Sequence, residues 1–167
     1  IDAPWSRLDP VKRVPFRAAS KSSEAAVLAA PVSLHRIDSG QVRPATLTPT
    51  LLTGVLRDSL RFGGLVVTDA LDMGGIVNTY GPGEAAVLAL LAGADILLQP
   101  TDPAVAIDAV VAAVEQGRVT QARLDQSVQA VQAVAGVRAA IGNPVQTAGL
   151  RDRLMAKLDS PERAAVA

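Results

Sequence analysis

Cysteine is absent from all 167 residues, which excludes disulfides and thiolate metal sites. A single histidine, His35, excludes a metal site built from several histidines. Aromatic residues make up only 2% of the chain, so there is little surface for stacking on nucleic-acid bases. The 16 basic residues balance 16 acidic ones, and no apolar run approaches the ~20 residues of a membrane-spanning helix. We therefore expect no metal, no cofactor, no nucleic-acid partner and no membrane-spanning segment.

Small aliphatic residues dominate what is present. Hydrophobic residues make up 49% of the sequence, and most of them are Ala, Val and Leu. This composition is typical of tightly packed helices and buried parallel strands. A chain of this length fits one domain that buries roughly 70% of its unfolded surface.

Apolar runs alternate with amphipathic segments along the chain. Strands are expected near Ala26–Ser33, Leu65–Thr68 and Ile96–Leu98. A hydroxyl or carboxylate followed by proline marks helix starts at Thr48-Pro49 and Asp102-Pro103. Further helices are expected over 84–92 and from Thr120 onward, with weaker ones over 11–19 and 147–158. Strands that alternate with helices through short connections pair in parallel, so the sequence predicts an α/β fold.

Asp69 is the most informative acidic residue because it follows the buried Leu65–Thr68 strand directly. Functional groups collect at the C-terminal ends of parallel strands. A carboxylate there can attack carbon, accept a proton, hold a metal or accept a phosphoryl group. The alternative is that Asp69, or Asp72 three residues later, only caps a turn or a short helix.

The other polar candidates favour structural roles. Asp95 is expected to bond backbone amides of its own turn, and Asp102 to cap a helix. Glu84 is expected to complement the N-terminus of its helix. His35 follows a strand, but its neighbours form no recognisable catalytic pattern, so we interpret it as a loop histidine.

One continuous segment resembles the nucleophile region of family 3 glycoside hydrolases, and within that family the bacterial β-N-acetylhexosaminidase branch. It reads Phe62-Gly63-Gly64-Leu65-Val66-Val67-Thr68-Asp69-Ala70-Leu71-Asp72-Met73. Flanking segments are similar to that family in the same order: 14–19, 43–49, 92–98 and 127–128. The resemblance implies a carbohydrate substrate and the second half of a TIM-type (β/α)8 barrel, incomplete, with three parallel strands and flanking helices.

The resemblance also implies a mechanism. The family's first aspartate in that segment is the nucleophile, which maps onto Asp69 and implies a retaining reaction through a covalent glycosyl-enzyme. Three departures stand out. Ser59 replaces a usual acidic residue on the helix surface, and Pro31 replaces a histidine common in this branch. The branch's acid/base histidine belongs to a Lys-His-Phe-Pro-Gly-His-type loop, which this sequence lacks, and His35 has none of those neighbours.

We therefore expect residues 1–145 to be the C-terminal part of the barrel domain and residues 146–167 to be a helical linker toward a second domain. The chain is expected to require an N-terminal half-barrel and to be inactive alone. The leading interpretation is a fragment of a retaining β-glycosidase acting on terminal β-linked sugars, N-acetylglucosaminides in particular, by hydrolysis or, in a related active site, phosphorolysis. The alternatives are a non-catalytic binding or structural piece and, more remotely, a phosphoacceptor receiver-like domain.

Overall fold

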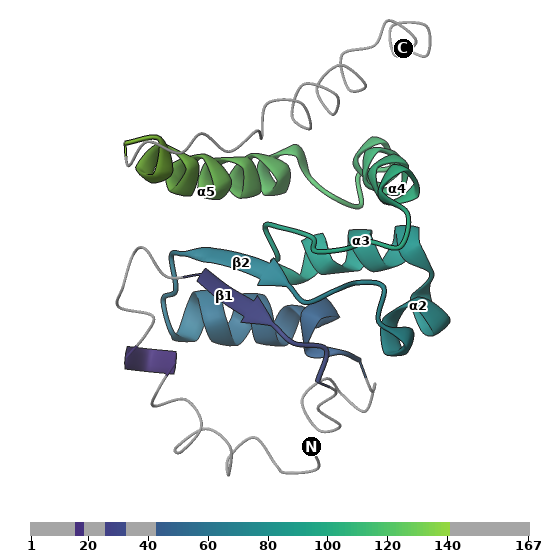
Figure 1. Cartoon of the computed structure of the whole chain (residues 1–167), viewed down its shortest axis with the longest axis horizontal. Coiled ribbons are helices and arrows are strands. Elements are labelled where there is room, and N and C mark those ends of the chain that lie inside the picture. Colours follow the sequence, from purple (N-terminus) through teal and green to yellow (C-terminus); the bar gives the residue numbers. More distant parts are fainter. Residues whose placement is uncertain (1–15, 19–25, 33–42, 141–167) are drawn as a thin grey trace, which may run out of the picture.

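A computed structural model describes residues 16–18, 26–32 and 43–140, with side chains described as far as 134 (Figure 1). Residues 16–18 form a helical turn within the segment expected to be helical over 11–19. The named elements, in chain order, are β1 (Ala26–Ala29), η1 (Ala45–Leu47), η2 (Thr50–Ser59), β2 (Leu65–Thr68), α2 (Gly74–Tyr80), α3 (Pro82–Ala92), α4 (Pro103–Glu115) and α5 (Gln121–Ala140). His35 and the segments expected over 146–167 lie outside the described residues.

The strands β1 and β2 lie side by side and are parallel, with Ala26 opposite Leu65 and Ala29 opposite Thr68 (Figure 1). The first strand ends at Ala29, so the expectation that it runs to Ser33 is wrong for residues 30–32. The reason is Pro31, which has no N–H to donate to a ladder. Instead the Val32 N–H donates to the Ala30 carbonyl at 2.8 Å in a tight turn.

The third expected strand is reduced to one parallel bridge between Val67 and Ile96. Its neighbour and its direction were predicted correctly, but its length was not. On both sides of the bridge, side-chain oxygens accept the N–H groups that backbone carbonyls would accept in a continuous ladder. The Val66 N–H donates to Asp95 Oδ2 at 2.9 Å, and the Leu98 N–H donates to Thr68 Oγ1 at 2.8 Å.

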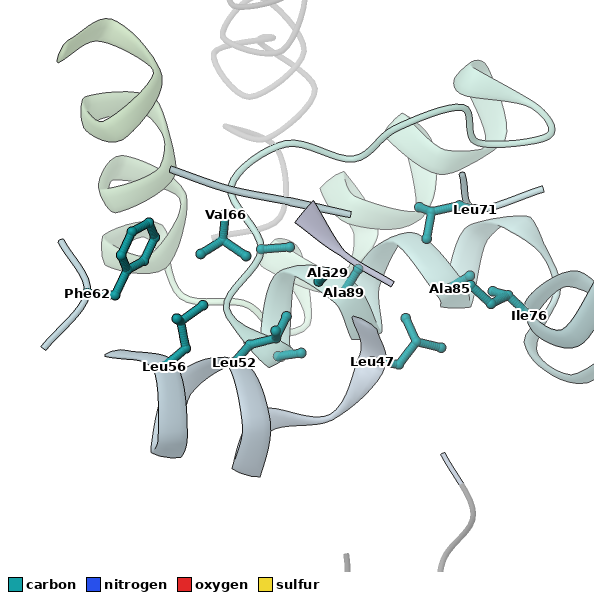
Figure 2. Close-up of a cluster of buried hydrophobic side chains, with 12 residues drawn as sticks. Ala29, Leu47, Leu52, Leu56, Phe62, Val66, Leu71, Ile76, Ala85 and Ala89 are labelled. Carbon is teal, nitrogen blue, oxygen red and sulfur yellow. The ribbon is translucent and has the colours of Figure 1, made fainter. Parts of the chain in front are cut away.

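One of two apolar clusters in the described residues lies between β2 and the helices η2 and α3, and the other joins α3 to α4 and α5. Figure 2 shows Leu52 and Leu56 of η2 directed toward Val66 of β2, all three of them buried. In β1, Ala29 is buried in this core, whereas Leu28, whose side chain alternates to the opposite face, is 58% exposed. The sheet therefore packs one face against its own helices.

The helix η2 begins within two residues of the expected start at Thr48-Pro49, but it ends at Ser59, before Gly63-Gly64, and is wound as a π-helix. Such helices are rare beyond a single turn. Its last turn is closed by the Leu60 N–H, which donates to the Val55 carbonyl at 2.9 Å. Thr48 does not cap it, contrary to expectation, because its hydroxyl donates to the Pro44 carbonyl at 2.9 Å.

The remaining helices follow their local signals, with one exception. The Asp102 carboxylate accepts the N–H groups of Ala104 and Val105 at the start of α4, and the Thr120 hydroxyl accepts an N–H at the start of α5, so both caps are confirmed. The helix α3 ends at Gly93, whose φ of +119° favours glycine. The helix α2 was not predicted, because it begins with two glycines and has no side-chain cap. Within the described residues no helix is long and apolar enough to cross a membrane.

Candidate functional site

Asp69 lies immediately beyond β2, at the C-terminal end of the parallel strands and half-buried. Its N–H donates to the Ala29 carbonyl at the end of β1, at 3.0 Å. One carboxylate oxygen, Oδ1, accepts the Ala70 N–H at 2.9 Å. Among the described residues the other oxygen, Oδ2, has no hydrogen-bond partner.

The backbone around Asp69 is held by hydrogen bonds to the segments on both sides of it. On the β1 side, the Thr46 hydroxyl also donates to the Ala29 carbonyl, at 2.8 Å. On the other side, the Leu71 N–H donates to the Leu98 carbonyl at 2.9 Å, and Leu71 itself is 2% exposed. The turn that carries Asp69 is therefore fixed between its two neighbouring strand ends.

Asp72 has a different environment. It is exposed, in the turn between Leu71 and α2. The residue that precedes α2 is Met73, and no side chain caps this helix. Asp72 is therefore neither a helix cap nor held by a neighbouring strand, and the two aspartates are placed quite differently.

Asp95 lies in a cluster of charged and polar groups that the sequence did not predict. Its carboxylate is 2% exposed and contacts Arg57 at 2.6 Å and Arg123 at 3.4 Å. It also accepts from the Ser127 hydroxyl at 3.1 Å and from the Val66 N–H. The expectation that Asp95 bonds amides of its own turn is thus wrong, since its backbone partner belongs to β2.

The two arginines of this cluster join distant elements. Arg57 of η2 also donates to the carbonyls of Phe62 and Gly64, and Arg123 of α5 to those of Leu90 and Ala94. Burial lowers the pKa of the Arg123 guanidinium, and the Asp95 carboxylate opposes that shift. The Arg123 guanidinium remains charged at physiological pH. The cluster lies at the start of the Ile96 bridge, away from Asp69, and is structural.

Glu84, in the first turn of α3, forms a bidentate ion pair with Arg118, with oxygen–nitrogen distances of 2.6 and 3.0 Å. Hydrogen bonds and charge from Glu84 raise the pKa of Arg118 above its ordinary value. Both side chains are about two-fifths exposed, which fits the structural role expected for Glu84. Within the described residues, no cluster of His, Asp or Glu side chains could hold a metal ion.

The fold of the chain is similar to that of solved glycosidases. A glycoside hydrolase family 3 β-N-acetylglucosaminidase from Paenibacillus sp. str. FPU-7 superposes with a TM-score of 0.78 at 37% identity, over 88% of this chain and 28% of that one. The β-N-acetylglucosaminidase from Thermotoga maritima gives 0.73 at 31% identity, over 80% of this chain and 30% of that one. The fold is thus that of a glycosidase unit.

The sequence identifies the family. The family model "Glycosyl hydrolase family 3 N terminal domain" matches residues 1–134, and the chain therefore belongs to glycoside hydrolase family 3. β-Hexosaminidase A of Pseudoalteromonas piscicida is 44% identical over 59 residues, which are 35% of this chain. β-Hexosaminidase of Chromobacterium violaceum is 36% identical over 100 residues, 60% of this chain. The chain spans only 10% and 27% of the lengths of these two curated relatives.

Proposed function

We propose that this chain supplies the nucleophile, Asp69, of a retaining β-glycosidase that acts on terminal β-linked N-acetylglucosaminides. The observation that carries the proposal is the geometry of that carboxylate. It stands at the C-terminal end of a buried strand, with Oδ1 held by the Ala70 N–H and Oδ2 without a partner in the described part of the chain. The strand ends of parallel α/β folds are where catalytic groups collect.

In the proposed reaction, Asp69 attacks the anomeric carbon of the sugar and the aglycone leaves. A covalent glycosyl-enzyme forms on the carboxylate and is then hydrolysed by water. The Ala70 N–H holds Oδ1 in place, so that Oδ2 keeps a fixed direction during the attack. A nucleophile fixed in this way needs little reorganisation to reach the transition state.

We further propose that the general acid/base and the remaining barrel strands come from segments outside these 167 residues. None of the described residues places a second acid or a histidine against Asp69 by hydrogen bond or ion pair. The Leu28 side of β1 is exposed and apolar, as expected of a surface that other strands cover. In this proposal residues 1–145 complete that barrel, and residues 146–167 link it to another domain.

The proposed substrate class is based on the activities for which the similar proteins are named. Both solved structures reported above are β-N-acetylglucosaminidases, and both curated relatives are β-hexosaminidases. The similarity includes the Asp69 region, because the matched family domain covers residues 1–134. An N-acetylglucosaminide is therefore the first substrate to test.

The test uses the full-length protein and a fluorinated N-acetylglucosaminide analogue with an activated leaving group. Such an analogue forms the covalent intermediate without help from a general acid and releases it slowly. We expect peptide mapping to find the sugar on Asp69, no label in Asp69→Ala, and retained labelling in Asp72→Ala. Asp72 is the matched control, since it lies in the same turn but is exposed. A label on any residue other than Asp69 would refute the proposal.

A further inference from the structure

The carbonyl of Ala29, at the end of β1, accepts two hydrogen bonds from two different segments of the chain. One donor is the Asp69 N–H at 3.0 Å, and the other is the Thr46 hydroxyl at 2.8 Å. Ala29 is 7% exposed and Thr46 is fully buried. A carbonyl oxygen has two lone pairs, so these two donors satisfy it completely without water.

This carbonyl is the last point at which β1 holds the segment carrying Asp69. The register ends at Ala29 opposite Thr68, and beyond it the chain turns away at Pro31. A strand end next to such a turn has no further ladder bond to fix its direction. The Thr46 hydroxyl supplies a further restraint on this carbonyl.

Thr46 is part of a segment that packs into the core. It belongs to η1, whose Leu47 is fully buried in the core beneath the sheet. The connection therefore runs from a packed helix through Thr46 and Ala29 to the backbone of Asp69.

We propose that Thr46 is a positioning residue for the Asp69 nucleophile: by fixing the Ala29 carbonyl it fixes the backbone from which the carboxylate is aimed. The inference rests on the proposed function of Asp69. Thr46 is fully buried and so offers no exposed atom for a sugar to contact, and we expect its effect to fall on the rate of attack and not on affinity.

The expected change in rate can be judged from how strongly the rate of attack depends on the position of the Asp69 carboxylate. A displacement of 1 Å can cost about 10²-fold in rate. Thr46 is one of several restraints, since the Ala70 N–H and the Leu98 carbonyl also hold this turn. We therefore expect loss of its hydroxyl to slow formation of the glycosyl-enzyme about 10-fold.

The experiment measures covalent labelling of the full-length protein by the same activated, fluorinated analogue. Thr46→Val is expected to lower the limiting rate constant of labelling about 10-fold, with the half-saturating concentration and the final stoichiometry unchanged. Thr46→Ser, which keeps the hydroxyl, is expected to restore the rate. A purely structural role would lower the stoichiometry, which counts folded sites, and leave the rate constant of the remaining sites unchanged.

Thr48→Val is the matched control. Thr48 is equally buried in the same loop, but its hydroxyl bonds only within that loop, so its rate constant should equal that of the wild type. A normal rate constant in Thr46→Val, or equal slowing in Thr48→Val, overturns the inference. If Thr46→Val does not fold, Thr46→Ala gives the same comparison. Labelling of Asp69→Ala would instead refute the proposed function itself, so the two failures are distinguishable.

Discussion

Replacing Asp95 by asparagine tests the charged cluster that joins η2, β2 and α5. The substitution keeps the shape of the side chain and an oxygen that can still accept the Val66 N–H. It removes the negative charge between Arg57 and Arg123, whose side chains are only 24% and 17% exposed. Breaking one partner of a buried ion pair costs about 3–5 kcal/mol.

The structure places the expected cost at the lower end of that range. Both guanidinium groups keep hydrogen bonds to backbone carbonyls after the substitution, so they lose a counter-charge but not all of their acceptors. We therefore expect Asp95→Asn to lower the free energy of unfolding by about 3 kcal/mol. That is a large share of the total stability of a typical domain, about 5–15 kcal/mol.

The assay is urea denaturation of the full-length protein, comparing Asp95→Asn with the wild type at one pH and at low and high salt. The loss should persist at high salt, because buried charges are screened little. Glu84→Gln is the control, since it removes the carboxylate of an exposed ion pair and should leave the midpoint unchanged. A loss below about 1 kcal/mol in Asp95→Asn would show that the cluster is not a buried ion pair of the kind argued here.

Other substitutions test the remaining local arguments by the same denaturation assay. Gly93→Ala should cost about 2 kcal/mol, because φ is +119° and the new Cβ would lie 2.9 Å from the Thr53 hydroxyl oxygen; an unchanged midpoint would contradict this. Asp102→Ala should lower the stability by about 1 kcal/mol through loss of the cap of α4. Asp102→Asn should keep most of the stability that the cap provides. Gly83→Ala should destabilise by about 1 kcal/mol, because its Cβ would lie 2.9 Å from a side chain of α4. At Gly75 an added Cβ would have nothing within 4 Å, so Gly75→Ala should stabilise α2 by about 0.5 kcal/mol. If Gly83→Ala and Gly75→Ala changed the stability equally, that would argue against close packing of α3 on α4.

Features set by neighbours in the sequence were predictable. The helix α4 begins at an aspartate followed by proline, and α3 ends at Gly93, because capping and positive φ depend on residues next to each other. Asp69 was placed at a strand end for the same reason, since Leu65–Thr68 is a short apolar run that ends directly before it.

Features set by residues distant in the sequence were not predictable. Asp95 is held by Arg57 and Arg123, which come from two different helices and follow no spacing rule. The third strand is short because the side chains of Asp95 and Thr68 take the place of backbone partners. The link from Thr46 to the Ala29 carbonyl likewise appears only once β1 and η1 are folded together.

The position of the Asp95 cluster along the chain has a consequence for folding during synthesis. Arg57 precedes Asp95 and can pair with it as soon as both have left the ribosome, but Arg123 and Ser127 belong to α5, which is made later. Until α5 docks, the Asp95 carboxylate stays open to water and the start of β2, at Val66, lacks the cover of that helix. The sheet is therefore expected to become protected from amide hydrogen exchange only in nascent chains that extend past Ser127.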